Sequence, residues 1–329
     1  MFDALTLNDK PLLVIGRAGM DLYADPPGSR TEEAEQFTTA LGGSSANTAA
    51  ALARYGIPST LLTCVSDDAI GRYVLNQLKH YKINTDLVKT ISGDERTSLA
   101  IVETRVEEHQ SVIYRNNAAD FQMSSQQVEA VNFDDYRALV ITGTCLTLEP
   151  SRSASLLALQ RAADAGLPVI MDLDYRPYSW ETPEKAQQVY QQAVAYVDLL
   201  VGNDEEFGHL AGNYEDGLAQ AALLASRGCN CIYKRGELGS KALLSDGRLI
   251  QTGVYPVTPL KPTGAGDAFL GALLASLCRA EPITEAIRLG SAAAAIVVTR
   301  VGCAPAMPLL DEVKQFIRTR NTTQEVSGV

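Results

Sequence analysis

Short apolar segments alternate with longer amphipathic ones in the second half of the chain, and this rhythm restricts the fold more than any other feature. Strands are expected at residues 138–142, 168–172 and 199–201, with helices at 151–165 and 183–196 between them. Alternation of this kind predicts right-handed crossovers and a mostly parallel sheet. The fold class is therefore α/β, and polar residues that follow the strands lie on the edge where open parallel sheets bind ligands.

A second, smaller sheet is expected from the first half of the chain. The β-branched runs at 97–103 and 111–114 are separated by a charged loop, which favours a hairpin. The segment before residue 37 is rich in Asp, Pro, Gly, Ser and Glu, and is too polar for a core. If the hairpin pairs with that segment, a small β-sheet lid results.

Composition excludes several classes of protein. The 329 residues suffice for one large α/β domain or two ordinary ones. A net charge of −11 argues against a nucleic-acid partner, which would need clustered Lys and Arg. No apolar run reaches the roughly 18 residues of a membrane span, and the first residues lack a signal-peptide pattern. A cytoplasmic location is expected, with the six scattered cysteines as reduced core thiols.

The stretch KPTGAGDAFLGALLAS, residues 261–276, joins a glycine-rich turn to an apolar helix expected at 268–277. Gly264 and Gly266 allow a ligand to approach successive backbone N–H groups. The unpaired first amides and the positive dipole end of the helix form an anion site. Asp267 is either an ordinary cap of this helix or a general base beside an anion hole, the arrangement that a kinase requires.

Other polar clusters follow expected strands. Asp21 comes after the apolar run 11–16, and is either a site residue or a turn carboxylate. Gly42 and Gly43 precede a small-residue helix that carries Asn47, so backbone amides and a side-chain amide are available there to a polar ligand.

Two clusters lie farther along the chain. Residues 203–206 (NDEE) are either a site or a solvated helix start. The strand expected at 231–235 runs into the glycine turn 236–240, which suits nucleotide phosphates. Arg115 follows the second strand of the hairpin and is either a solvated arginine or an anion clamp.

Four signals in one order resemble the ribokinase-like (PfkB) carbohydrate kinases across nearly the whole chain. The first is an early Gly-Gly with a downstream Asn (Gly42, Gly43 and Asn47), and the second is an Asn-x-x-Glu at a strand end (Asn203 and Glu206). The third is a Lys-x-Gly turn (Lys234, Gly236 and Gly239), and the fourth is a late Gly-Ala-Gly-Asp (Gly264, Ala265, Gly266 and Asp267). The resemblance implies a Rossmann-type three-layer α/β/α fold with a mostly parallel central sheet. It also implies a single kinase domain over residues 1–329, with lid segments at about 17–37 and 97–118.

The resemblance implies a role for each signal. Asp267 would be the base toward a substrate hydroxyl, and the amides of residues 264–266 would form the anion hole. Asn203 and Glu206 would organise Mg²⁺ and its waters around ATP, which fits the oxygen preference of that ion. Lys234, Gly236, Gly239 and Lys261 would contact ATP. The residues that would hold the sugar are Asp21, Gly42, Gly43 and Asn47.

A narrower resemblance is to the sugar-acid kinases of the family, whose substrates are 5-dehydro-2-deoxygluconate and 2-keto-3-deoxygluconate. It is carried by the stretches 114–116 (YRN), 172–180 (DLDYRPYSW) and 302–308 (GCAPAMP). Two guanidinium groups would supply the bidentate donors that a carboxylate needs, so Arg115 and Arg176 are assigned as carboxylate contacts. Fructokinase and other neutral-sugar activities remain as alternatives.

Lys261 departs from the family pattern. Many members carry an aspartate there that helps to bind a monovalent cation, and a lysine cannot coordinate K⁺. We therefore expect no K⁺ dependence, with the Lys261 ammonium in place of the ion or with the cation site simply absent.

A catalytically silent sugar-binding regulator on the same fold is the competing class of function. The presence of Asp267 with the intact glycines disfavours it. A dinucleotide-dependent oxidoreductase fails because no G-x-G-x-x-G follows the first strand. The relatives suggest a homodimer formed through the lid. The phosphorylated position and the role of the cysteines are not specified by the sequence.

Overall fold

The computed structural model describes residues 2–6, 9–323 and 327–328. It divides into two compact units, each assembled from segments that are distant in the sequence. The first unit consists of Met1–Ile15, Ser124–Val254 and Thr322–Val329, and the second of Gly16–Met123 and Tyr255–Asn321.

A mostly parallel sheet runs through the first unit in the order β14-β13-β12-β11-β10-β9-β8-β1. Its strands are Leu12–Ile15 (β1), Ala138–Thr142 (β8), Val169–Asp172 (β9), Leu199–Asn203 (β10), Asn230–Lys234 (β11), Ser240–Leu243 (β12), Leu249–Thr252 (β13) and Ser327–Gly328 (β14). The pairs from β1 to β11 are parallel and those from β11 to β14 antiparallel. Every residue of β1, β8 and β9 is buried, which explains why these strands appear in the sequence as continuous apolar runs.

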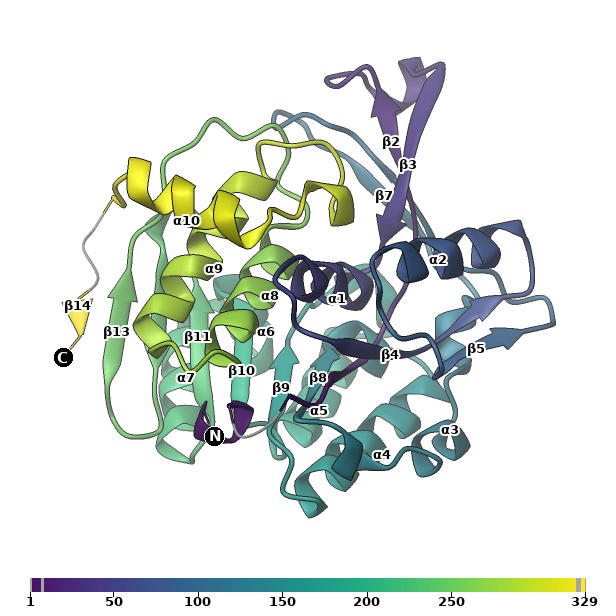
Figure 1. The fold of residues 1–329 in the computed structure, drawn as a ribbon. Helices are drawn as coiled ribbons and strands as arrows, with labels where there is room; N and C mark the ends of the chain where they lie inside the picture. Colours follow the sequence, from purple (N-terminus) through teal and green to yellow (C-terminus); the bar gives the residue numbers. More distant parts are fainter. Residues whose placement is uncertain (1, 7–8, 324–326, 329) are drawn as a thin grey trace. The chain divides into compact units, whose positions relative to one another are not determined.

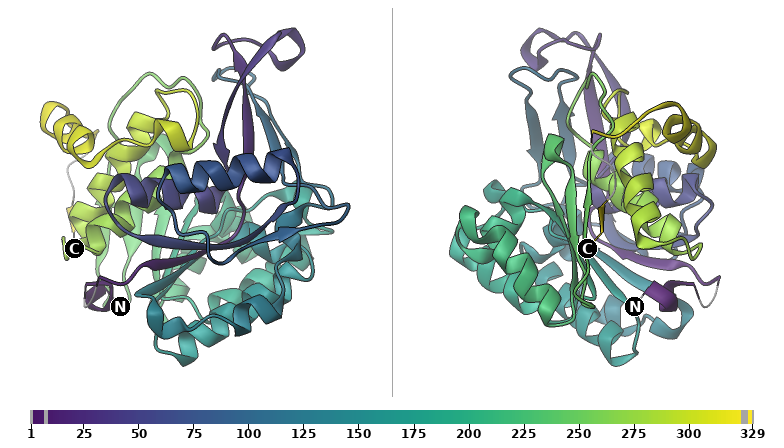
Figure 2. Two further views of the ribbon diagram at one scale, coloured as in Figure 1. Left: turned by 45° about the vertical axis from the view of Figure 1, so that its right-hand side comes forward. Right: turned by 90° about the vertical axis from the view of Figure 1, so that its left-hand side faces the viewer.

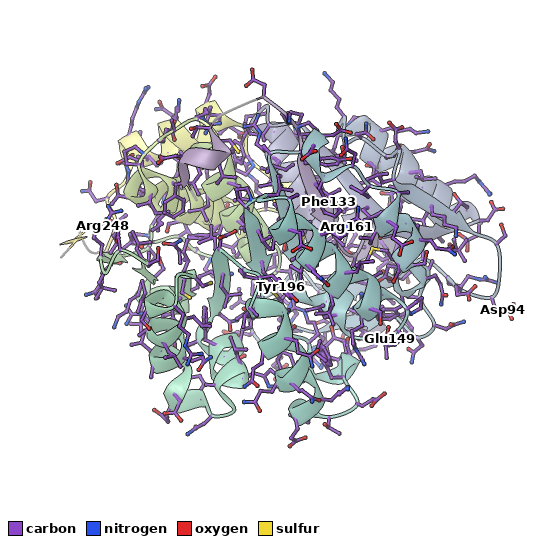
Figure 3. The ribbon with its side chains drawn as sticks, turned by 90° about the horizontal axis from the view of Figure 1, so that it is seen from below. Asp94, Phe133, Glu149, Arg161, Tyr196 and Arg248 are labelled. Atoms are coloured by element: carbon purple, nitrogen blue, oxygen red, sulfur yellow. The ribbon has the colours of Figure 1, made fainter. Side chains whose placement is uncertain are left out.

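The helices of the first unit connect these strands. They are Ser125–Glu129 (α3), Ser151–Asp164 (α4), Pro183–Val194 (α5), Asp204–Ala211 (α6) and Gly217–Ser226 (α7). Figure 2 shows α4 to α7 along one face of the sheet. The hydroxyl of Thr182 caps α5 by accepting from the amide of Lys185 at 3.1 Å. The guanidinium of Arg161 on α4 lies 6.0 Å from the centroid of the Phe133 ring (Figure 3), which ties α4 to the segment before β8.

Three polar side chains of the first unit stand at one edge of the sheet. Asp172, Asn203 and Lys234 are the last residues of the adjacent parallel strands β9, β10 and β11. In the strand register, Asp172 is opposite Val201, and Asn203 is opposite Lys234. Parallel pairing therefore gathers these residues, although they come from separate parts of the sequence.

The second unit is built around an almost wholly buried helix, Ala265–Leu277 (α8). Its other elements are Ser44–Arg54 (α1), Ser59–Ser66 (β4), Ala69–His80 (α2), Val88–Ile91 (β5), Ile283–Val297 (α9) and Leu310–Thr319 (α10). α8 packs against α9 and α1. A methyl group added to Gly271 of α8 would lie 2.4 Å from Cβ of Ala51, so α8 and α1 approach each other closely at this glycine.

A separate four-stranded sheet completes the second unit, in the order β3-β2-β6-β7. Its strands are Gly19–Asp25 (β2), Gln36–Gly42 (β3), Leu99–Val102 (β6) and Ser111–Tyr114 (β7), and Figure 1 shows β2 and β3 side by side. One face of the sheet forms an apolar cluster that includes Tyr23, Ala100 and Cys303.

Short 3₁₀ turns join the main elements in both units. They are Phe2–Leu5, Thr31–Glu33, Ala119–Gln122, Phe133–Asp135, Gly143–Leu146, Pro177–Ser179, Tyr214–Asp216, Gly236–Leu238 and Ala304–Ala306.

The structure confirms the predicted α/β class, the mostly parallel sheet and the small second sheet. The predicted hairpin is the β6–β7 pair, and it joins the polar N-terminal segment through β2. Among the described residues, no helix combines the length and the apolar character needed to cross a membrane. All six cysteines are free thiols, and five of them are buried.

Candidate functional site

The turn before α8 places the first backbone N–H groups of the helix where no carbonyl of the helix can pair with them. Gly264 adopts a left-handed conformation with φ of 86° and is the residue before the helix, so α8 begins at Ala265. This start is three residues earlier than the sequence suggested, because the glycine reverses the chain within the turn itself. Asp267 is therefore the third residue of α8 rather than its cap. The first amides of α8 have no carbonyl within the helix to bond to, which leaves donors for an anion.

Asp267 is held by a side chain from another helix of the same unit. Nδ2 of Asn47 on α1 donates to Oδ2 of Asp267 at 2.9 Å. Oδ1 of Asn47 is buried and has no hydrogen-bond partner among the described residues. A donor such as a sugar hydroxyl would satisfy this oxygen.

Lys261 is completely buried, with 0% of its surface exposed. Its ammonium donates to the carbonyl oxygen of Thr263 at 2.5 Å. Burial lowers the pKa of Lys261, and the neighbouring acidic groups Cys303, Asp267 and Asp21 oppose this shift. The ammonium thus adds positive charge near the carboxylates of Asp21 and Asp267.

Asp21 is buried on β2 and fixed by its neighbours. The hydroxyl of Tyr23 donates to Oδ2 of Asp21 at 3.0 Å and lies 3.1 Å from Sγ of Cys303. A methyl group at Gly42 would lie 1.9 Å from Oδ1 of Asp21, so the carboxylate needs a glycine at this position. Burial raises the pKa of Asp21, and the charge of Arg17 opposes this shift most strongly.

Gly43 starts α1 as Gly264 starts α8. It has φ of 95° and precedes Ser44, the first residue of the helix. Gly43 therefore opens a second set of amides in the same unit.

Arg115 is buried and already paired. Its guanidinium forms an ion pair with Asp120, including a hydrogen bond of 3.1 Å from Nε to Oδ2. It also lies over the ring of Phe121, 4.1 Å from the centroid. These contacts fix the orientation of Arg115.

The first unit holds the second predicted cluster. Asn203 and Glu206 form a reciprocal capping box at the start of α6, with both hydrogen bonds at 2.8 Å. Glu206 also accepts from the amide of Tyr175 at 3.2 Å. Burial, together with the charge of Asp172, raises the pKa of Glu206 to about 7.

Lys234 lies beside this cluster. Its ammonium is 3.9 Å from Oδ2 of Asp172. Burial raises the pKa of Asp172, and the charge of Lys234 opposes this shift. The glycine turn follows, with Gly236 at φ of 53° and Gly239 at 79°. A methyl group at Gly239 would lie 1.9 Å from the carbonyl oxygen of Thr252, which makes this glycine necessary for the turn.

Arg176 is partly exposed, with 44% of its side-chain surface accessible. It pairs with Asp174 at 2.6 Å and donates to the carbonyl of Tyr175 at 3.2 Å. Asp174 has φ of 39°, which is uncommon for a residue with a side chain. The loop is thus held in a defined conformation.

The cluster around Glu206 offers oxygen atoms that a divalent cation would reach partly through water. Asp172, Asp174 and Glu206 are buried carboxylates, and Lys234 and Arg176 already place positive charge beside the first two. In the described part of the chain, no group of three or more His, Cys, Asp or Glu side chains is arranged to hold a metal ion directly. Asn203 and Glu206 already bond each other, so water would complete the coordination of any ion here.

The sequence alone assigns no individual role to Arg17, Tyr23 or Cys303, and it includes Asp172 only as the first residue of the polar stretch 172–180. Tyr23 and Cys303 are 280 positions apart in the sequence, so no local pattern could pair them. A role for Asp172 could have been predicted, because this residue ends a predicted strand, as other site residues do.

Comparison with known proteins agrees with the predicted family. Residues 9–310 match the pfkB family carbohydrate kinases. The 5-dehydro-2-deoxygluconokinase of Photobacterium profundum is 38% identical over 319 residues, covering 95% of this chain and 96% of that one. The 5-dehydro-2-deoxygluconokinase 1 of Bacillus cereus is 35% identical over 314 residues, covering 94% and 95%.

Solved structures share the ribokinase-like fold. A putative ribokinase II of Escherichia coli in complex with ATP and Mg²⁺ superimposes with a TM-score of 0.83 at 22% identity, covering 94% of this chain and 99% of that one. A fructokinase of Vibrio cholerae with fructose, ADP and calcium bound gives 0.82 at 23% identity, covering 94% and 100%. The fold, the order of the motifs and the relatives agree, and the chain belongs to the pfkB family of carbohydrate kinases.

Proposed function

We propose that this carbohydrate kinase transfers the γ-phosphoryl group of ATP to the primary hydroxyl of 5-dehydro-2-deoxygluconate. The observation that carries the chemistry is Asp267, held by Asn47 within the first turn of α8. The choice of substrate rests on the relatives that carry this name, at 35–38% identity over nearly the full chain. 2-Keto-3-deoxygluconate is the second candidate substrate.

The residues of the second unit account for the acceptor side of the reaction. The carboxylate of Asp267 accepts the proton of the primary hydroxyl, whose oxygen then attacks the γ-phosphorus. The amides of Gly264, Ala265 and Gly266 hold the negative charge that develops on the phosphoryl oxygens. Asp21, Gly42, Gly43 and Asn47 bind the remaining polar groups of the sugar.

The residues of the first unit account for the nucleotide side. Asn203 and Glu206 would hold Mg²⁺ through water, and the ion would supply positive charge beside the ATP phosphates. Lys234 and the turn containing Gly236 and Gly239 bind the nucleotide. Lys261 is also assigned to ATP, and residues 1–329 act as one kinase domain.

A screen for ADP release tests this function. Purified protein is given ATP and Mg²⁺ with one of four acceptors: 5-dehydro-2-deoxygluconate, 2-keto-3-deoxygluconate, fructose or ribose. We expect the highest kcat/KM with the first acid. Preference for fructose or ribose over both acids would contradict the sugar-acid assignment, and binding without turnover of any acceptor would favour a non-catalytic regulator.

Lys261 leads to a second element of the proposal, that the enzyme does not require K⁺. Its buried ammonium already supplies positive charge near Asp21 and Asp267. A monovalent cation bound by the same loop would bring like charges together, which is unfavourable in a buried site.

The outer face of the small sheet supports a homodimer. Phe37, Val112 and Tyr114 are 37%, 45% and 58% exposed, and the strand register puts them on one face, opposite the apolar cluster around Tyr23. Exposed apolar side chains gathered on a sheet are typical of an interface. β3 and β7 are also edge strands of this sheet, with backbone groups available for pairing.

Sedimentation equilibrium tests the dimer. We expect twice the monomer mass for the wild type and a shift toward monomer when Val112 and Tyr114 are both replaced by Ser. Replacing the exposed Leu238 of the first unit by Ser is the matched control and should leave the mass unchanged. A monomeric wild type at micromolar concentration would refute the dimer.

A further inference from the structure

Arg17 has a backbone position that the surrounding glycines fix. It lies between β1 and β2, and its carbonyl oxygen accepts from the amide of Ala46 in the first turn of α1 at 3.3 Å. A methyl group at Gly43 would lie 2.4 Å from that same oxygen. The turn that contains Gly43 and the backbone of Arg17 therefore pack directly against each other.

The side chain of Arg17 is oriented from one end only. Nη1 donates to Oγ of the buried Ser98 at 3.1 Å. A methyl group at Gly19 would lie 3.2 Å from Nη1 and 2.7 Å from Oγ, so the absence of a side chain there lets the guanidinium and the serine meet. In the part of the chain that the structure describes, this is the guanidinium's one hydrogen bond.

The rest of the guanidinium remains available to a ligand. Arg17 is half-buried, and its charge lowers the pKa of Asp21 more than the charge of any other residue does. No ion pair within 4.0 Å joins Arg17 to Asp21 or to another described carboxylate. An arginine that is held at one nitrogen and keeps its other donors is prepared for a planar anion.

Arg115 offers a contrast within the same unit. Its guanidinium is buried, bonded to Asp120 and stacked on Phe121. Separating a buried arginine from its carboxylate partner is costly, since it leaves an uncompensated charge. Of these two arginines, Arg17 is the one whose charge has no carboxylate in contact.

We propose that Arg17 binds the carboxylate of the sugar acid and is a determinant of selectivity for acids over neutral sugars. This inference rests on the proposed function, because it presupposes an acidic substrate. The primary hydroxyl and the carboxylate stand at opposite ends of the molecule. Asp267 receives the hydroxyl end, and Arg17, beside Asp21 and Gly43, receives the acid end.

Arg17 could instead act only through Asp21, by favouring its ionised form. That role would affect every substrate that uses Asp21, whatever its charge. The two roles are separated by comparing an acid with a neutral molecule of the same carbon skeleton.

The experiment uses Arg17→Gln and Arg17→Lys in the full chain, with 5-dehydro-2-deoxygluconate and its primary amide as substrates or competing ligands. For Arg17→Gln we expect the KM of the acid to rise roughly 10- to 150-fold, which corresponds to the loss of a charged hydrogen bond. The kcat should change little, because the contact exists equally in the ground and transition states. The affinity for the amide should be nearly unchanged. Arg17→Lys keeps the positive charge but loses the planar pair of N–H donors of the guanidinium, so its KM for the acid should be intermediate.

Equal weakening of acid and amide binding in Arg17→Gln would overturn the proposal, as would an unchanged KM for the acid. The melting temperature and the Kd for ATP of each variant show whether the fold is intact. Ser98→Ala provides a second test with the arginine retained, and it should raise the KM for the acid more than that for the amide. Failure of the proposed function gives a different result, because the wild-type enzyme would then not phosphorylate the acid at all.

Discussion

Replacing Asp267 by Asn is expected to lower kcat by about 10²- to 10⁴-fold, the usual contribution of a general base. The substitution keeps the shape of the side chain, and its carbonyl oxygen can still accept from Nδ2 of Asn47. It removes the group that takes the proton of the attacking hydroxyl. The measurement is steady-state ADP release, together with calorimetric titration of ATP, whose Kd should be nearly unchanged.

Asp311→Asn is the matched control for this experiment. Asp311 is an exposed carboxylate in the first turn of α10, so it has the same chemistry and a similar place in a helix. Its variant should retain wild-type turnover. Near-normal kcat in Asp267→Asn would remove Asp267 from the proton transfer and would leave it a structural role at the start of α8.

Replacing Lys261 by Ala is expected to reduce both stability and activity. Loss of the buried ammonium removes a positive charge near Asp21 and Asp267 and leaves the carbonyl oxygen of Thr263 without its donor, and an unsatisfied buried polar group costs about 1–3 kcal/mol. We expect the free energy of unfolding to fall by a similar amount. We also expect a lower kcat/KM for the sugar. Urea unfolding and steady-state kinetics provide these two quantities.

Potassium distinguishes the possible roles of Lys261. Activity is measured in Tris buffer with KCl or with tetramethylammonium chloride at equal ionic strength. Wild-type activity should be the same in both salts, and Lys261→Ala should recover part of its activity in KCl only. Lys314→Ala, which removes an exposed lysine of α10, should respond like the wild type. Strong K⁺ activation of the wild type would contradict the role of Lys261 as a built-in cation.

The sequence predicted those parts of the fold that have a local signal. Buried strands such as β8 and β9 are continuous apolar runs, and the glycine turns before α1 and α8 have a distinctive composition. The start of α8 was less accurately placed, because composition does not reveal that Gly264 already turns the chain. The role of Asp267 as a cap or a base could not be decided from its neighbours in sequence.

The partners of the site residues could not be predicted in the same way. The contact of Asn47 with Asp267 spans 220 positions, and that of Arg17 with Ser98 spans 81. The pair formed by Arg115 and Asp120 is separated by only five positions, yet nothing in the local sequence indicates that the arginine is buried. Such contacts depend on how helices and strands pack.

The close approach of α1 and α8 links the packing of the core to the chemistry. Ala51 lies four residues after Asn47 on α1, and Gly271 lies four residues after Asp267 on α8, so each pair shares one helical face. The contact of Ala51 with Gly271 therefore acts as a spacer one turn below the hydrogen bond between Asn47 and Asp267. An enlarged side chain at this spacer would move Asn47 and Asp267 apart without touching any substrate. For protein engineering, this makes an ordinary core position a means of adjusting the alignment of the base.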